Sequence, residues 1–260
     1  MVRAQIFHSH IAFLTLLKKE IIRFKKVAFH TVAAPVLSSL LYLIVFGAVL
    51  EERMVVSDAY SYLDFLVPGL VMMAVLQNAF ANTSSSFIQS KISGTLSFIL
   101  MPPLSSAQIA LAYVLSATLR GLFVGLFVWI GTMFWVSPMI DSFVWIAVFA
   151  LQGAMMMATL GLITAIWADR YEQMGVIQNF IIMPLTFLSG VFYSTKALPE
   201  TWQQLTFFNP MFYLIDGFRG GFLGGFETSP WESALWGSVA LILCFAGAVA
   251  LLKVGFKICQ

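Results

Sequence analysis

The first candidates for chemistry in this 260-residue chain are the few polar side chains that interrupt its long apolar stretches. They are one cation and four amides: Arg120, Asn78, Asn82, Gln178 and Asn179. An arginine near the centre of a bilayer costs about 2.5–3.5 kcal/mol on insertion scales, and each polar group in lipid has to find a partner. These side chains therefore serve binding: they line helix contacts or a path through the membrane, and both interpretations are open.

Arg120 is the most conspicuous of the five because no acidic residue is expected at comparable depth in the apolar stretches. Its expected partners are one of the amides, a backbone carbonyl, or an anionic substrate or lipid headgroup. A long cationic side chain can also extend to the nearer membrane surface and keep its charge in water. The sequence supports that simpler arrangement equally well.

The sequence lacks the residue patterns of the common catalytic sites. A phosphate-binding loop needs glycines ahead of a Lys and a Ser or Thr at fixed spacing, and the nearest lookalike, from Gly190 to Lys196, lacks the second glycine. The chain contains no HExxH motif and no nucleophile elbow. No cluster of Cys or carboxylates accompanies His8, His10 and His30, so a metal site is not expected. We therefore do not expect an enzyme.

Composition indicates an integral membrane protein. Hydrophobic residues make up 60% of the chain and charged residues 10%, against roughly 45–50% and 25% in soluble domains. Six stretches are long enough to cross a hydrocarbon core of about 30 Å: they lie near Val27–Leu50, Phe65–Ile88, Ala107–Val136, Phe143–Ala168, Met174–Tyr193 and Ser233–Leu252. The expected fold is all-α, with a six-span core over residues 27–252 and one domain over residues 1–260, since the remaining segments are too short to bury a separate soluble core.

Basic residues gather on one side of the expected spans. The side with both termini holds ten Lys and Arg against three acidic residues, whereas the other side holds three against nine. Lys and Arg in short flanking segments resist translocation, so we expect both termini in the cytoplasm. The net charge of +2 then reflects membrane topology, and nucleic acid is not an expected partner.

Residues 1–26 predict an amphipathic helix on the membrane surface. Leu14, Leu17, Ile21 and Phe24 recur at spacings of three or four residues, and the Lys and Arg residues lie largely on other faces. Such a helix turns its apolar stripe toward acyl chains and its cations toward anionic headgroups, which makes membrane lipid an expected partner. An ordinary positively charged flank of the first span is the alternative.

A short cytoplasmic segment, residues 89–103, joins the second and third stretches. It has one charge, Lys91, followed by Gly94 and Thr95, and two consecutive prolines then stop any helix. Its apolar side chains are candidate contacts with a partner: Ile92, Leu96, Ile99 and Leu100. A plain turn between spans is the alternative. Residues 168–172 form a second cytoplasmic loop, for which simple charge anchoring is favoured.

Residues 194–232 leave the membrane between the last two stretches but stay semi-apolar. The landmarks of this segment are two prolines followed by a tyrosine and an arginine: Pro199, Pro210, Tyr213 and Arg219. The prolines and the many aromatic residues predict two short helices that re-enter the outer leaflet, because aromatic side chains prefer interfacial depth. Asp216 and Arg219 are three residues apart and are expected to pair locally rather than to bind substrate.

The run LSGVFYSTKALPETWQQLTFFNPMFYLIDGFR, from Leu188 to Arg219, resembles the carboxy-terminal signature of ABC-2 type permeases, the membrane subunits of ATP-driven exporters. Residues 89–103 are similar to the coupling helix of that family, which docks on the ATPase. The resemblance assigns this role to five residues: Lys91, Gly94, Thr95, Leu96 and Leu100. The family usually has charged residues before the Gly-Thr pair, where this chain has Gln89, Ser90, Ile92 and Ser93.

The resemblance covers essentially the whole chain and implies a permease that works as a homodimer in the bacterial inner membrane with two copies of a cytoplasmic ATPase. ATP and Mg belong to that partner, and this chain is expected to bind no cofactor. In the family, spans two and five border the central route, which would place the four amides there, and the outer hairpin caps it. The cargo would be amphipathic, lipid-linked or drug-like. A non-transporting scaffold or assembly factor is the alternative.

Overall fold

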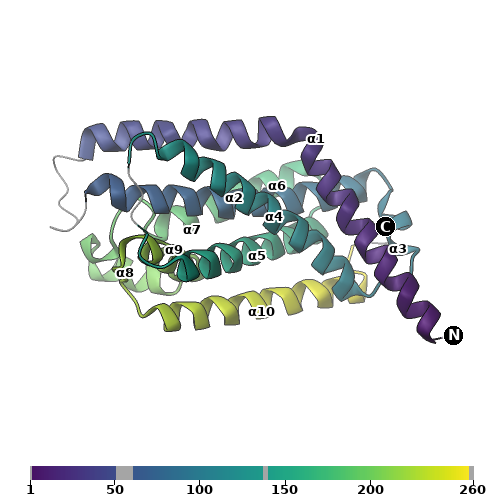
Figure 1. The fold of residues 1–260 in the computed structure, drawn as a ribbon. Coiled ribbons are helices and arrows are strands. Elements are labelled where there is room, and N and C mark those ends of the chain that lie inside the picture. Colours follow the sequence, from purple (N-terminus) through teal and green to yellow (C-terminus); the bar gives the residue numbers. More distant parts are fainter. Residues whose placement is uncertain (1, 51–60, 137–139, 258–260) are drawn as a thin grey trace.

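The computed structural model describes residues 2–50, 61–136 and 140–257, and all regular structure within those ranges is helical. Five long helices run roughly along one axis (Figure 1): α1 (Val2–Leu50), α2 (Tyr62–Ile92), α4 (Ser106–Thr132), α5 (Phe143–Trp167) and α10 (Pro230–Val254). Five shorter helices connect them: α3 (Leu96–Leu100), α6 (Tyr171–Ile177), α7 (Met183–Leu188), α8 (Glu200–Phe207) and α9 (Pro210–Leu223). The predicted all-α class is confirmed.

α1 runs without interruption through both the expected interfacial helix and the first span. Figure 1 shows its amino-terminal part inclined to the remainder. The chain has neither Gly nor Pro between residue 2 and Pro35, so the sequence contains no residue that would end the helix earlier. The interfacial segment is therefore a continuation of the first span. Four charged residues on which the expected orientation depends lie outside the described residues: Glu51, Glu52, Arg53 and Asp58.

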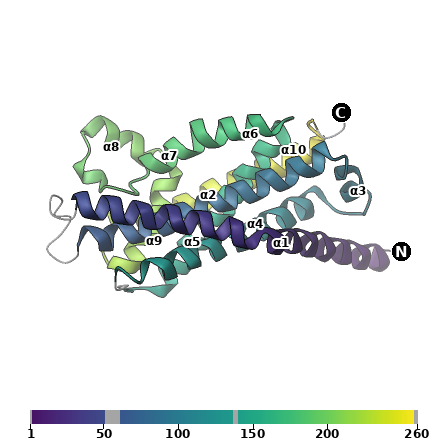
Figure 2. The ribbon, with the colours of Figure 1, turned by 90° about the horizontal axis from the view of Figure 1, so that it is seen from above.

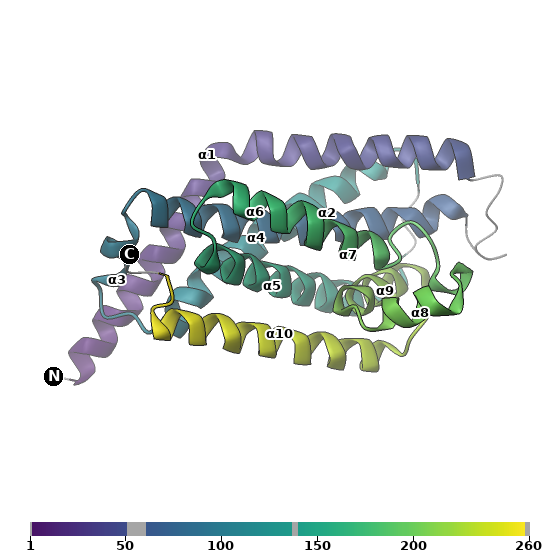
Figure 3. The same ribbon diagram turned by 180° about the vertical axis from the view of Figure 1, so that it is seen from behind.

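Five helices in the described ranges are long and apolar enough to cross a membrane: Phe29–Val49 within α1, and the whole of α2, α4, α5 and α10. The expected fifth span, residues 174–193, has a different form. There α6, a π-helical turn (Gln178–Ile182) and α7 follow one another along one edge of the bundle (Figures 2 and 3). The existence of a sixth span at this position stays a prediction.

Pro184 explains the π-helical turn. The N–H of Met183 donates to the carbonyl of Gln178, five residues earlier. Proline has no N–H, so Pro184 cannot bond to the carbonyl of Phe180 as the next residue of a regular helix would. A wider turn immediately before the proline accommodates that missing bond, and such turns are frequent at functional sites.

α2 lies at the centre of the fold and is buried along most of its length. Small residues let neighbouring helices approach it closely. A Cβ atom on Gly161 of α5 would lie 2.5 Å from the Phe80 carbonyl oxygen, and one on Gly121 of α4 would lie 2.8 Å from that of Val75. Close backbone packing of this kind drives helix association where lipid is as apolar as the side chains.

Gly161→Ala should destabilise the protein. The added methyl group would meet a backbone carbonyl, which cannot move aside alone, and overpacking of this kind costs about 1–3 kcal/mol. Gly247→Ala is the matched control because a Cβ there has open space around it, and helical Gly→Ala changes normally stabilise by roughly 0.5–1 kcal/mol. The measurement is the thermal unfolding midpoint of the purified chain in neutral detergent. Equal midpoints for the two variants would contradict the close packing of α5 on α2.

Candidate coupling and translocation sites

Residues 89–103, the candidate coupling segment, form the end of α2, a tight turn and the short helix α3. Gly94 ends α2 with φ of +70°, a left-handed conformation that glycine adopts without strain. The Thr95 hydroxyl donates to the Ser90 carbonyl at 3.3 Å and lies 2.9 Å from Ser93 Oγ. Gly94 and Thr95 therefore determine the direction in which α3 leaves α2.

The apolar side chains of this segment divide between core and surface. Leu96 is only 4% exposed and Ile99 packs partly against the core, which removes both from the expected set of direct contacts. Four others are exposed: Ile92, Phe98, Leu100 and Met101. Phe98 and Met101 were missed in the sequence, because five residues of helix are too few to show which face turns inward.

Lys91 does not point into solvent as a free contact charge. Its ammonium group donates to the carbonyls of Ile166 at 3.1 Å and Ala168 at 2.9 Å, and to Asp169 Oδ1 at 3.0 Å. The other oxygen of Asp169 accepts from Lys257 Nζ at 2.7 Å. One carboxylate thus joins the end of α2, the loop after α5 and the segment after α10. Residues 89–103 and 168–172, the two short connecting segments singled out in the sequence, form one unit.

Asp169→Asn should loosen this unit. Hydrogen bonds from Lys257 and Lys91 lower the pKa of Asp169 in the folded protein. The Asp169 carboxylate therefore stabilises the fold at pH values above about 3.9, the ordinary pKa of an aspartate. This stabilisation is lost as the pH falls through the lower pKa of the folded state. Between pH 5 and 8 we expect constant protection in the wild type, and faster amide hydrogen exchange of residues 168–172 and 255–257 in the variant.

The matched control is Glu172→Gln, which removes an exposed carboxylate from the first turn of α6, directly after the loop. Added salt should weaken the wild-type link, because exposed charge pairs are screened. Identical exchange rates in the two variants would show that the carboxylate of Asp169 does not hold the three segments together.

Arg120 finds its partner in Asn82. Its Nη1 donates to Asn82 Oδ1 at 2.9 Å, and Arg23 Nη2 donates to the same oxygen at 2.9 Å and to the Asn82 carbonyl at 3.2 Å. Arg23 comes from the amino-terminal part of α1, so Asn82 joins α1, α2 and α4. Of the partners expected for Arg120, the structure selects the amide of Asn82.

An acidic residue does lie beside this group, contrary to the expectation from the sequence. Glu20 of α1 is fully buried, pairs with Arg23 Nε at 3.2 Å and Lys19 Nζ at 3.3 Å, and accepts a hydrogen bond from the Ser86 hydroxyl of α2. In the sequence, Glu20 is one of the three acidic residues counted on the side of the termini. The one feature of the sequence that could have indicated its burial is that Glu20 is the only acidic residue among the first 50.

The inward face of α1 also differs from the expected apolar stripe. Leu16 and Glu20, four residues apart, are buried, whereas Leu14 is 60% exposed. The helix therefore presents a face to the protein that includes a carboxylate. Leu14 and the exposed Ile11 lie on other faces, where lipid contact is open to them.

Asn78 lies one turn from Asn82 on α2 but lines a separate cavity of about 270 Å³. The cavity lies between α1, α2 and α7, and its polar lining has hydroxyl and amide groups without a formal charge: Ser38, Ser39, Tyr42, Gln77 and Asn78. Gln178 is half-buried and Asn179 exposed on the π-helical turn, and neither is among the lining residues. The structure thus separates the amides that the sequence grouped together.

Arg219 anchors the end of the bundle opposite α3 (Figure 1). It is buried, its Nη2 donates to the carbonyls of Gly190 at 2.6 Å and Val191 at 3.2 Å, and its guanidinium lies 3.7 Å from the ring centroid of Phe65. α9 is thereby connected to the turn after α7 and to the start of α2. Arg219 is a structural link within the chain.

Asp216 has hydrogen-bond partners beyond the expected Arg219. Its carboxylate accepts from the N–H groups of Glu227 at 3.1 Å and Thr228 at 3.0 Å, and from the Thr228 hydroxyl at 2.9 Å. These bonds fold the loop that leads into α10. Arg219 acts electrostatically on this carboxylate, as the spacing of three residues suggests, while both side chains also form hydrogen bonds to neighbouring loops.

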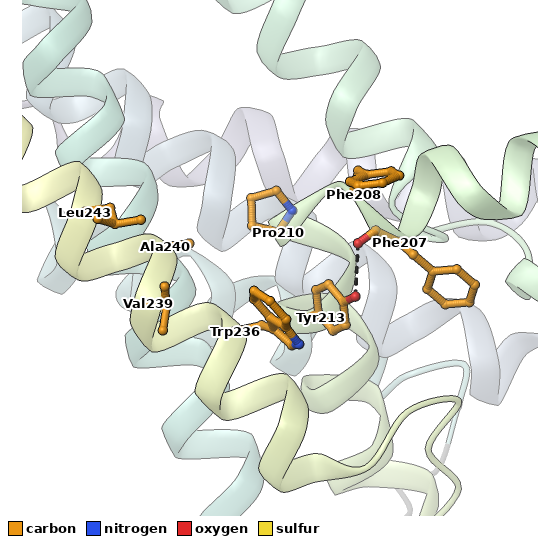
Figure 4. A pocket seen from close by; sticks show the side chains of 8 residues that line it. All are labelled: Phe207, Phe208, Pro210, Tyr213, Trp236, Val239, Ala240 and Leu243. Carbon is orange, nitrogen blue, oxygen red and sulfur yellow. Dashed lines mark hydrogen bonds between the residues drawn. The ribbon is translucent and has the colours of Figure 1, made fainter.

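The two prolines of the outer segment each begin a helix. Pro199 directly precedes α8, and Pro210 is the first residue of α9, whose amino end is capped by Asn209. The two predicted helices are present, and their re-entry into the outer leaflet stays a prediction. Tyr213 donates to the Phe207 carbonyl at 3.0 Å and, together with Trp236 of α10, lines an apolar groove of about 570 Å³ (Figure 4).

These features define a multi-pass membrane protein with an uncharged polar cavity between helices and an exposed apolar segment at one end of the bundle. The family model for the ABC-2 type transporter matches residues 11–223, and the chain belongs to that family. It is 38% identical over 206 residues to the inner membrane transport permease YadH of Escherichia coli, covering 79% of this chain and 80% of that protein. It is 28% identical over 213 residues to nodulation protein J of Rhizobium meliloti, covering 80% and 79%.

Proposed function

We propose that this chain is the permease subunit of an exporter whose ATP hydrolysis takes place on a separate cytoplasmic subunit. The observation that carries the proposal is the position of α3. It follows the central helix α2 directly, and it exposes Phe98 and Met101 at the end of the bundle that also holds the start of α1 and the end of α10 (Figure 1). An apolar surface of this kind at the end of a buried helix suits docking of a partner that pushes on that helix.

The route for the cargo runs beside α2 in this proposal. Asn78 and Gln77 offer amide groups to the cavity, α1 adds hydroxyl groups, and Met73, Met183 and Phe187 add apolar surface. Such a lining fits a ligand that has both neutral hydrogen-bonding groups and an apolar part. We therefore favour an amphipathic or lipid-linked cargo, and we assign Gln178 and Asn179 to the side of the route formed by the π-helical turn.

Two copies of the chain would form the route together, with two ATPase subunits on the cytoplasmic side. The relative from Escherichia coli is named as an inner membrane transport permease, which supports the same membrane for this protein. The excess of basic residues beside both termini supports a cytoplasmic location for them. ATP and Mg are bound by the partner in this assembly.

The proposal is tested by purifying the protein from its native membrane in mild detergent and identifying what remains bound. We expect a soluble ATP-binding subunit in equal amount, with vanadate-sensitive hydrolysis. A clean preparation that lacks any ATPase, repeated under gentle conditions, would contradict the proposal.

Phe98→Asp should lower the affinity of the permease for its ATPase subunit by at least about tenfold, because truncating a central apolar contact typically costs 1–2 kcal/mol or more. The side chain is 69% exposed, so the folded permease should keep its unfolding midpoint. Leu96→Asp is the contrasting variant: this side chain is buried, and the change should lower the midpoint itself. The readout is the ratio of ATPase to permease after purification. An unchanged ratio for Phe98→Asp would remove α3 from the docking surface.

A further inference from the structure

The polar group around Asn82 has more positive than negative charge. Two guanidinium groups, those of Arg23 and Arg120, donate to one neutral oxygen, Asn82 Oδ1. Glu20 is the carboxylate that pairs with Arg23. Among the residues that the structure describes, no carboxylate lies within 4.0 Å of Arg120. The positive charge of Arg120 is therefore left without a compensating negative charge.

Two buried donors in the same group also lack an acceptor within the described part of the chain. They are Arg120 Nε and Asn82 Nδ2. Asn82 as a whole is only 1% exposed. The orientation of the amide is determined by its neighbours, since a flipped amide would turn its NH₂ group toward two guanidinium groups. Unsatisfied buried donors are rare in native proteins and call for an acceptor.

The position of the group along α1 places it at the membrane surface. The apolar part of α1, Phe29–Val49, has 21 residues, which span about 30 Å of hydrocarbon. Arg23 and Glu20 precede that part and so lie at headgroup level, from where Arg23 reaches Asn82 of α2. The side chains of Lys19 and Arg23 are 46% and 28% exposed, so the group opens to the outside at these two residues, and Arg120 Nε and Asn82 Nδ2 lie buried behind them.

We infer that Arg23, Arg120 and Asn82 form a binding site for a phosphate group, with Lys19 at its edge. Phosphate supplies both missing elements, the negative charge and the acceptor oxygens, and guanidinium groups bind it through paired hydrogen bonds. At headgroup level the phosphate belongs to an anionic lipid or comes from solution. The site holds α1, α2 and α4 together and does not depend on the transport function proposed above.

The site is tested by the thermal unfolding midpoint of the full chain in neutral detergent, titrated with phosphatidylglycerol. Diacylglycerol, which has no phosphate, is the lipid control, and inorganic phosphate is the soluble probe. We expect phosphatidylglycerol to raise the midpoint and diacylglycerol to leave it unchanged. Arg120→Gln should weaken the apparent lipid affinity by about tenfold, because it removes the guanidinium charge and the charge-assisted hydrogen bonds that it would donate to phosphate. Lys25→Gln removes an exposed charge from α1, the helix of Arg23, and should leave the lipid affinity unchanged.

A second variant keeps the test decisive if Arg120→Gln fails to fold. Asn82→Asp places a carboxylate between the two arginines, so it should raise the lipid-free midpoint and abolish most of the response to phosphatidylglycerol. A lower midpoint together with an undiminished lipid response would overturn the proposal. So would equal losses for Arg120→Gln and Lys25→Gln, which would indicate diffuse attraction. A response to inorganic phosphate that disappears in Arg120→Gln would support the site with a soluble anion as its ligand.

Discussion

Each buried polar group in a membrane protein needs a partner, and α2 supplies such partners to several other segments of this chain. Asn82 binds the arginines of α1 and α4, and Lys91 binds the loop that follows α5. Near its other end, the ring of Phe65 lies against the guanidinium of Arg219 from α9. Three levels of one buried helix are thus connected to segments that are distant in the sequence, and the remaining helices pack around it.

This arrangement gives the proposed transport function a mechanical basis. α3 leaves α2 through the turn at Gly94, while Lys91 and Asp169 hold the end of α2 to the loop after α5. A force on α3 would therefore reach α2 and α5 together. Asn78, which lines the cavity, lies 13 residues before Lys91 on the same rigid element. Movement of the helix would change the width of that cavity without any change in local structure.

Some elements were predictable because their signals are local. Long apolar runs predict spans, Pro199 and Pro210 predict the starts of two short helices, and Gly94 predicts the end of α2, each through the chemistry of the residue itself. Glu20 and Phe98 were not predictable. A helical sequence indicates which residues share a face, but the neighbour of that face is chosen by packing between distant helices.

The sequence by itself determined that this protein is an all-α membrane protein of the ABC-2 transporter family, because apolar length and a fixed spacing of prolines and aromatic residues are properties of the chain. Only the tertiary structure decided that Glu20 is buried, that Asp169 bridges two lysines, and that Asn78 and Asn82 serve different sites. The physical reason is that a buried charge needs partners in three dimensions, and for Glu20 and its neighbour Arg23 they come from residues about 60–70 positions away in the sequence.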